Sequence, residues 1–261
     1  MRIGFFIQLT VTLLAAAFLI VPAIQSILAG LTVNYFRGLS SGLTLKWVFE
    51  VWDLYADSIL LSLWLALGCL VATLIIGVPA AYGLARNPGR TSRVLEEFVS
   101  LPLAVPGLAL ALALLQLYGT MKGFRMSAMF ILVGHILYTL PFMIRSVLAV
   151  MAAMDLKTLE ESAATLGAPP WRTFIDIVVP NAMPGILAGA LTVVTLSIGE
   201  FNLTWMLHTP LLKTLPVGLA DSYASMRLEI ASAYTLVFFI MIVPLLTAMQ
   251  WASNRLSRIN P

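Results

Sequence analysis

Long stretches without charged residues alternate with short charged segments along this chain of 261 residues. Because an α-helix needs about 20 apolar residues to cross about 30 Å of hydrocarbon, each of these stretches is long enough to span a membrane. None of them shows the period-two alternation that is typical of a β-barrel strand. The pattern predicts six membrane-spanning helices, at about residues 5–29, 58–85, 98–118, 127–150, 182–206 and 231–252.

The composition agrees with a membrane protein. Apolar residues make up 60% of the chain and charged residues only 10%, whereas a soluble domain carries about 25% charged residues. Charge this scarce excludes an ordinary cytosolic enzyme, a disordered chain and a disulfide-stapled secreted module. The formal net charge of +3 is too small to argue for a nucleic-acid partner. We therefore expect an all-α membrane protein whose residues 1–261 form a single transmembrane domain.

The sequence contains no catalytic or metal-binding constellation. Cys69 is the single cysteine, and His135 and His208 are isolated along the chain, so we expect no metal site. An interhelical hydrogen bond is the expected role of His135. The chain also lacks the Gly-x-x-x-x-Gly-Lys-Ser/Thr phosphate-binding motif. We therefore predict that it is not an enzyme and binds no cofactor itself.

The distribution of Lys and Arg predicts that both termini are cytoplasmic. With six spans the two termini lie on the same side, and with the N-terminus inside, the inner segments hold more Lys and Arg than the outer ones. The apolar run from Ile3 to Val21 is longer than the 7–15-residue core of a usual signal peptide. The first helix is accordingly expected to be retained.

The longest predicted inner segment, residues 151–180, has the pattern of two short helices joined by a corner. The run from Leu156 to Leu166 is amphipathic and rich in good helix formers. Gly167 can take the left-handed conformation that ends a helix, and Pro170 can start the next one. Pro180 is expected to end the second helix. Such a platform suits either a lid over the helix ends or a docking site for a soluble partner.

Residue spacing within this segment favours the docking site. Five positions fit the pattern Glu-Ala-Ala, three residues, Gly, nine residues, Ile, one residue, Leu, Pro; they are Glu161, Ala163, Gly167, Ile177 and Pro180. Ser162 and Val179 depart from it conservatively. The segment resembles the EAA loop of permease subunits of binding-protein-dependent ABC importers. Residues 73–86 and 101–107 are similar to segments of the spermidine/putrescine, phosphonate and ferric-iron branches.

The resemblance implies a type I permease fold, with one anchor helix followed by a core of five. In that family the EAA loop sits in a groove of a separate ATPase, so Glu161 is implied to be the coupling carboxylate. ATP and Mg would be bound by an ATPase dimer. Other implied partners are a solute-binding protein, membrane lipid and a second permease subunit, with a heterodimer favoured over a homodimer. The implied location is the bacterial inner membrane.

The predicted fifth span carries the candidate solute pathway. Glu200 lies well inside it, and an ionised carboxylate at membrane depth costs at least about 2.5 kcal/mol, so it should face protein or water. Helical periodicity predicts two polar stripes, one with Thr192, Thr195, Gly199 and Asn202 and the other with Ser197, Glu200 and Thr204. A helix with two polar stripes belongs in the centre of a bundle. The candidate pathway residues are Thr195, Gly199, Glu200 and Asn202, and the alternative for Glu200 is a buried structural anchor.

Two classes of transport protein are weighed for this chain. A stand-alone secondary transporter or channel predicts an inverted repeat, broken helices and paired ionisable groups at the midplane, and the sequence shows one Glu and no clear repeat. An ATP-driven importer subunit is therefore favoured. Its expected solute is small and charged or zwitterionic: a polyamine first, an aminophosphonate second, then ferric iron or an oxyanion.

Overall fold

The computed structural model describes residues 2–259, in which the regular structure is helical apart from two isolated β-bridges. The chain divides into two compact units. The first comprises residues 1–58 with Val217–Met241, and the second comprises Ile59–Pro216 with the chain from Ile242 onward.

Four helices of the described chain are long and apolar enough to cross a membrane. They are α1 (Arg2–Gly30), α2 (Lys46–Arg86), α6 (Ala128–Met151) and α13 (Leu228–Ile259). Six spans result if two bent helix pairs each count as one. These pairs are α3 (Arg90–Ala104) with α4 (Gly107–Tyr118), and Pro170–Asn181 with α10 (Met183–Gly199). Four of the six predicted spans thus each fall on one continuous helix, although α2 and α13 extend beyond the predicted bounds.

The first unit is held together where α1 crosses the start of α13. A Cβ built on Gly30 would lie 2.5 Å from the backbone nitrogen of Ala233, so only glycine allows this approach. Ser26 and Thr235 form a hydrogen bond of 3.2 Å beside it. In the segment after α1, which includes the 3-10 turn η1 (Gly38–Ser41), the Trp47 indole donates to the carbonyl of Thr32 at 2.9 Å.

Arg227, the residue before α13, binds the first turns of α2 within the first unit. Its guanidinium lies 3.1 Å from Glu50 Oε1 and donates to the Tyr55 hydroxyl at 2.8 Å. Tyr55 has non-helical backbone angles (φ −134°, ψ 17°), so a kink separates the first turns of α2 from its membrane-spanning part. Short helix α12 (Leu215–Ala224) precedes α13.

The core of the second unit lies between α6 and α10, which pack along each other through small residues. A Cβ on Gly185 would lie 2.7 Å from the carbonyl of Ser146, and one on Gly189 would lie 2.8 Å from Met143 Sδ. Small residues are what let membrane helices approach this closely. The Ser146 hydroxyl also donates to the Gly185 carbonyl at 2.8 Å. The α6–α10 pair is therefore the close-packed core of the second unit.

Two predicted spans are interrupted, which differs from the continuous helices expected over 98–118 and 182–206. The first breaks at Val105–Pro106, with 102° between α3 and α4. A residue before proline is pushed toward extended angles, and Val105 has φ −94° and ψ 126°. The second breaks at Glu200 (φ −70°, ψ 119°), between α10 and α11 (Asn202–Leu207).

Candidate functional site

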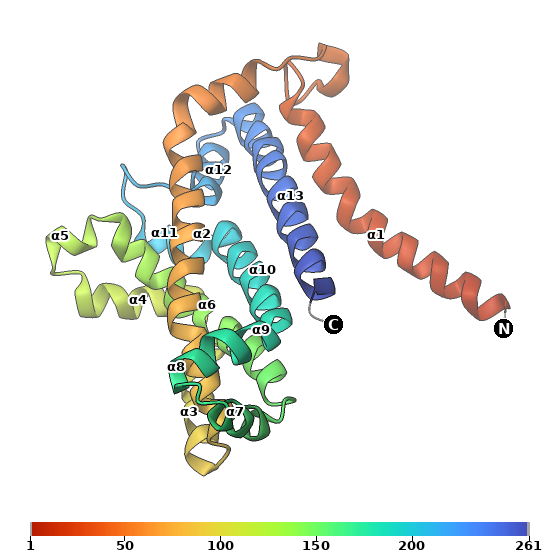
Figure 1. Ribbon diagram of the computed structural model, residues 1–261. Coiled ribbons are helices and arrows are strands. Elements are labelled where there is room, and N and C mark those ends of the chain that lie inside the picture. The colour runs from red at the N-terminus through yellow and green to blue at the C-terminus, as the bar shows by residue number, and fades with distance from the viewer. Residues whose placement is uncertain (1, 260–261) are drawn as a thin grey trace. The chain divides into compact units, whose positions relative to one another are not determined.

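The 151–180 loop begins with helix α7 (Leu156–Thr165), which is capped by Asp155. The carboxylate of Asp155 accepts hydrogen bonds from the Thr158 hydroxyl at 2.7 Å and from the Thr158 amide at 3.2 Å. These two bonds hold the pKa of Asp155 below its usual value. Leu156 and Ala163 are buried, so one face of α7 packs on the second unit. Figure 1 shows α7 at the same end of that unit as the start of α3.

The corner after α7 is a Schellman motif. Gly167 has φ +78°, which glycine adopts without the steric cost that a side chain brings. The amide of Ala168 donates to the Ala163 carbonyl at 3.0 Å and that of Gly167 to the Ala164 carbonyl at 2.9 Å. Pro170 then starts helix α8 (Pro170–Arg172). The predicted helix–glycine–proline–helix corner is confirmed.

The second short helix is longer than predicted. It continues from α8 through the π-helical turn η2 (Thr173–Val178) into α9 (Val179–Asn181). Pro180 is predicted to end it, but Pro180 lies within this run, one residue before the end of α9. The chain bends by 73° only after Asn181, where α10 begins.

Glu160 attaches the loop to the end of α2. Its carboxylate lies 3.0 Å from Arg86 Nε and accepts a short hydrogen bond from the Tyr82 hydroxyl. The Tyr82 ring also packs on Phe174 of η2, with centroids 4.9 Å apart. Sequence reasoning missed Glu160. The signal was present, because Glu160 lies four residues after Leu156 and three before Ala163, on the face of α7 that is buried.

The neighbouring Glu161 points the other way. Its side chain is 67% exposed and makes only a long contact, 3.8 Å, with Lys157. Of the other residues of the EAA pattern, Gly167 is exposed, Ile177 and Pro180 are partly buried, and Ala163 is buried. Three large apolar side chains of the loop remain in solvent: Leu166 at 89% exposure, Trp171 and Ile175. The loop is thus fixed on one face and presents carboxylate and apolar surface on the other.

The second feature of the site is the break at Glu200. Glu200 is only 8% exposed. Its Oε1 accepts from the amide of Leu203 at 2.9 Å, and its Oε2 accepts from both the amide and the hydroxyl of Thr204 at 2.8 Å. The carboxylate therefore satisfies the free N–H groups at the start of α11, where a negative charge is also favoured by the helix dipole.

His135 of α6 forms hydrogen bonds with residues on both sides of the break at Glu200. Its Nδ1 lies 2.9 Å from Ser197 Oγ, and its Nε2 lies 2.8 Å from Thr204 Oγ1. Because Thr204 donates its hydroxyl proton to Glu200, it must accept from His135. This pattern assigns the imidazole proton to Nε2 and makes Ser197 the donor to Nδ1. The interhelical hydrogen bond predicted for His135 is confirmed.

The two helix breaks of the second unit meet at Gly107. A Cβ built on Gly107, the first residue of α4, would lie 3.6 Å from Glu200 Oε1 and 3.6 Å from the amide of Leu203. Helix α11 packs against α4 along this side. The start of α4 and the start of α11 thus face the same carboxylate.

The two predicted polar stripes have different environments. Ser197, Glu200 and Thr204 are buried in the hydrogen-bond network around His135. Thr195, Gly199 and Asn202 are exposed, although the break at Glu200 interrupts the helix between them. The described residues include no group of three His, Cys, Asp or Glu side chains that could hold a metal ion.

Four to six helical segments long and apolar enough to span a membrane define a multi-pass membrane protein. The chain belongs to the family of binding-protein-dependent transport system inner membrane components, whose sequence profile matches residues 73–258. It is thus the permease type of subunit of an ABC importer, located in the inner membrane. Membership implies an ATPase, a solute-binding protein and a second permease subunit as partners.

Relatives extend this similarity over most of the chain. The molybdenum transport system permease protein ModB of Azotobacter vinelandii is 29% identical over 213 residues, which cover 76% of this chain and 93% of that protein. The putative 2-aminoethylphosphonate transport system permease protein PhnV of Salmonella typhimurium is 25% identical over 95% of this chain and 94% of its own length. The spermidine/putrescine transport system permease protein PotB of Escherichia coli is 28% identical over 78% of this chain and 79% of its own.

Proposed function

We propose that this chain forms, together with a second permease subunit, the translocation path of an ATP-driven importer for a small polar or charged solute. The solute is delivered by a solute-binding protein, and ATP is hydrolysed by a separate ATPase dimer that binds the 151–180 loop. Both chain termini lie in the cytoplasm in this proposal. Family membership supports it over a stand-alone secondary transporter, since the broken helices alone fit either class.

The proposal that this chain couples to an ATPase rests on the exposed surface of the 151–180 loop. Leu166, Trp171 and Ile175 are exposed on the same loop as Glu161, and exposed apolar side chains that gather among polar ones are typical of a protein interface. Glu160 and Ala163 pack the loop against the rest of the second unit. A movement of the loop caused by the ATPase is therefore transmitted to α2 through the ion pair of Glu160 with Arg86. Of the EAA residues, Glu161 contacts the ATPase, and Gly167, Ile177 and Pro180 shape the loop.

The solute pathway runs past the exposed side of the fifth span. Thr195, Gly199 and Asn202 are exposed there, and Glu200 serves the pathway by fixing the break beside them. A heterodimer is favoured over a homodimer, as the resemblance to polyamine and phosphonate permeases implies.

A polyamine is the favoured solute, followed by an aminophosphonate. The similarity to PotB supports the first and the similarity to PhnV the second, while the similarity to ModB keeps an oxyanion as a candidate for the test.

The test is uptake by vesicles that contain the complete importer, with its ATPase and binding protein, supplied with putrescine, 2-aminoethylphosphonate or molybdate. We expect ATP-dependent uptake of one of the first two solutes. Uptake of molybdate alone would refute the favoured solute class. Full transport by this chain without a second permease would refute the heterodimer, and uptake without the ATPase would refute the importer itself.

A further inference from the structure

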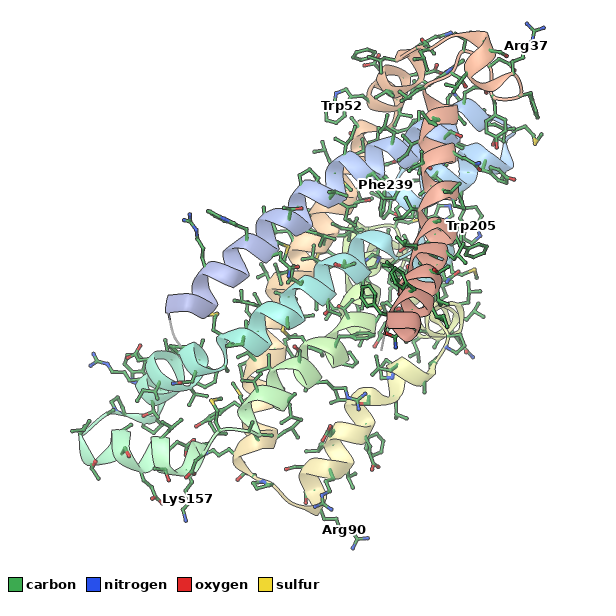
Figure 2. The ribbon with its side chains drawn as sticks, turned by 90° about the vertical axis from the view of Figure 1, so that its right-hand side faces the viewer. Arg37, Trp52, Arg90, Lys157, Trp205 and Phe239 are labelled. Carbon is green, nitrogen blue, oxygen red and sulfur yellow. The ribbon has the colours of Figure 1, made fainter. Side chains whose placement is uncertain are left out.

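A hollow of about 1250 Å³ opens at the loop end of the second unit, between the α2–α3 turn and the junction of α6 with α7. Four cationic side chains line it: Arg86, Arg93, Arg145 and Lys157. Figure 2 shows Lys157 at this end, together with Arg90 at the start of α3. The three acidic side chains of the lining are Glu96, Asp155 and Glu160.

Most of the acidic groups already have partners. Glu160 is held by Arg86 and Tyr82, and Asp155 caps α7 through Thr158. Among the side chains that the structure describes, neither Arg93 nor Arg145 has an ion-pair partner within 4.0 Å. Glu96 is the one acidic group of the lining not engaged in this way. With four cations and three carboxylates, the lining carries a formal net charge of +1, and Arg93 and Arg145 are the cations left to bind an anion.

Arg145 is the most informative of these cations. It lies six residues before the end of α6, about 9 Å along the axis, and so within the predicted span 127–150. A cation at this depth is costly unless it reaches water or an anion. Arg145 is exposed and faces the hollow.

The opposite wall adds hydrogen-bond donors. Gly89, the N-cap residue of helix α3, lines the hollow, and no side chain caps the first N–H groups of this helix. The Ser92 hydroxyl donates to the Asn87 carbonyl and keeps this turn closed. Free N–H groups at the start of a helix favour an anion. The partly exposed apolar side chains of Leu84 and Leu148 complete the wall.

We propose that this hollow binds the phosphate group of an anionic ligand, and specifically the headgroup of an anionic phospholipid of the cytoplasmic leaflet. Guanidinium groups bind phosphate oxygens in pairs, and basic pockets between membrane helices suit anionic headgroups. The apolar wall favours a lipid over free phosphate, since the acyl chain of a lipid can pack against it. The proposal rests on this hollow and on the proposed orientation of the chain, which puts the hollow at the cytoplasmic leaflet, and not on the coupling role of the loop.

The test measures phosphatidylglycerol retained by the complete importer in phosphatidylcholine nanodiscs doped with phosphatidylglycerol. Arg145→Gln and Arg93→Gln should each lower the affinity by about tenfold or more, the worth of one hydrogen bond to a charged group. Arg145→Lys, which keeps the charge but loses the paired donors, should retain an intermediate amount and controls for folding. Arg90→Gln is the matched control, because Arg90 begins the same helix but does not line the hollow.

The outcomes separate the sources of the ligand. Binding of inorganic phosphate that is lost in Arg145→Gln, with no phosphatidylglycerol retained by the unsubstituted protein, would overturn the assignment to a lipid and leave a site for free phosphate. Equal retention by Arg145→Gln and Arg90→Gln would overturn the proposal. So would crosslinking of the ATPase to a cysteine at Arg93 in a complex that retains no phosphatidylglycerol, since an acidic protein segment would then fill the hollow.

Discussion

At the scale of single residues, two adjacent glutamates of α7 have opposite environments. Glu160 faces inward, with its side chain 19% exposed and bound to Arg86 and Tyr82, whereas Glu161 faces solvent. We expect Glu160→Gln to weaken the attachment of α7 by about 0.5–1 kcal/mol, since Arg86 is itself half-exposed and its charge is screened.

Hydrogen–deuterium exchange of the α7 amides measures this effect. Glu160→Gln should speed exchange across α7. Glu161→Gln should leave exchange unchanged and lower ATPase binding, so it serves as the matched control. Equal exchange in both variants would contradict the anchoring role of Glu160.

We expect substitutions of Glu200 and Asn202 to affect different properties, protein stability for Glu200 and solute transport for Asn202. Glu200→Gln removes the charge that caps α11 and should lower stability by about 0.5–2 kcal/mol, the usual cost of losing a helix cap. Asn202 is exposed beside it, so Asn202→Ala should leave the melting temperature unchanged and reduce uptake. Thermal unfolding of the purified complex and vesicle uptake, measured on both variants, check this split. A drop in melting temperature for Asn202→Ala alone would contradict it.

At the scale of elements, the Schellman corner decides where the second loop helix points. Gly167→Ala must hold an alanine at φ +78°, which costs about 1 kcal/mol. Gly167→Pro should be harsher, since proline fixes φ near −65° and removes the amide that donates to Ala164. Both variants should insert normally and bind less ATPase in a co-purification assay, with the proline variant lowest. Gly123→Ala, at an open position, is the control and should bind normally.

Local signals predicted this corner but not the two helix breaks. Gly167 and Pro170 act on their own neighbours, so their effect can be read from the sequence. The break at Glu200 depends on His135 and Thr204, which lie far away along the chain or on the other side of the break. Ser197, Glu200 and Thr204 of this network form a polar stripe in the sequence, but a continuous helix would show the same stripe, and the stretch therefore reads as one helix. Pro106 was visible, but a proline inside an apolar run either kinks or ends a helix, and only the packing on Glu200 distinguishes the two.

At the scale of the whole molecule, six apolar stretches and a loop of paired short helices were evident from the sequence, because both depend on composition and turn chemistry. The orientation of the chain in the membrane remains a prediction. In a Cys69→Ser background, Ser162→Cys on exposed α7 should react only with thiol reagents that enter the cell. Ser40→Cys, exposed in the segment after α1, should react from outside. The reverse pattern would overturn the cytoplasmic termini.

The central claim is that the exposed face of the 151–180 loop couples this permease to its ATPase. Two leucines with almost equal exposure allow a matched comparison, Leu166 on the loop at 89% and Leu211 beyond α11 at 87%. The decisive measurement is co-purification of the ATPase, followed by ATP-driven uptake, for Leu166→Asp and Leu211→Asp. We predict that Leu166→Asp loses most ATPase binding and uptake, whereas Leu211→Asp keeps its ATPase. Full ATPase binding and full uptake by Leu166→Asp would contradict the account.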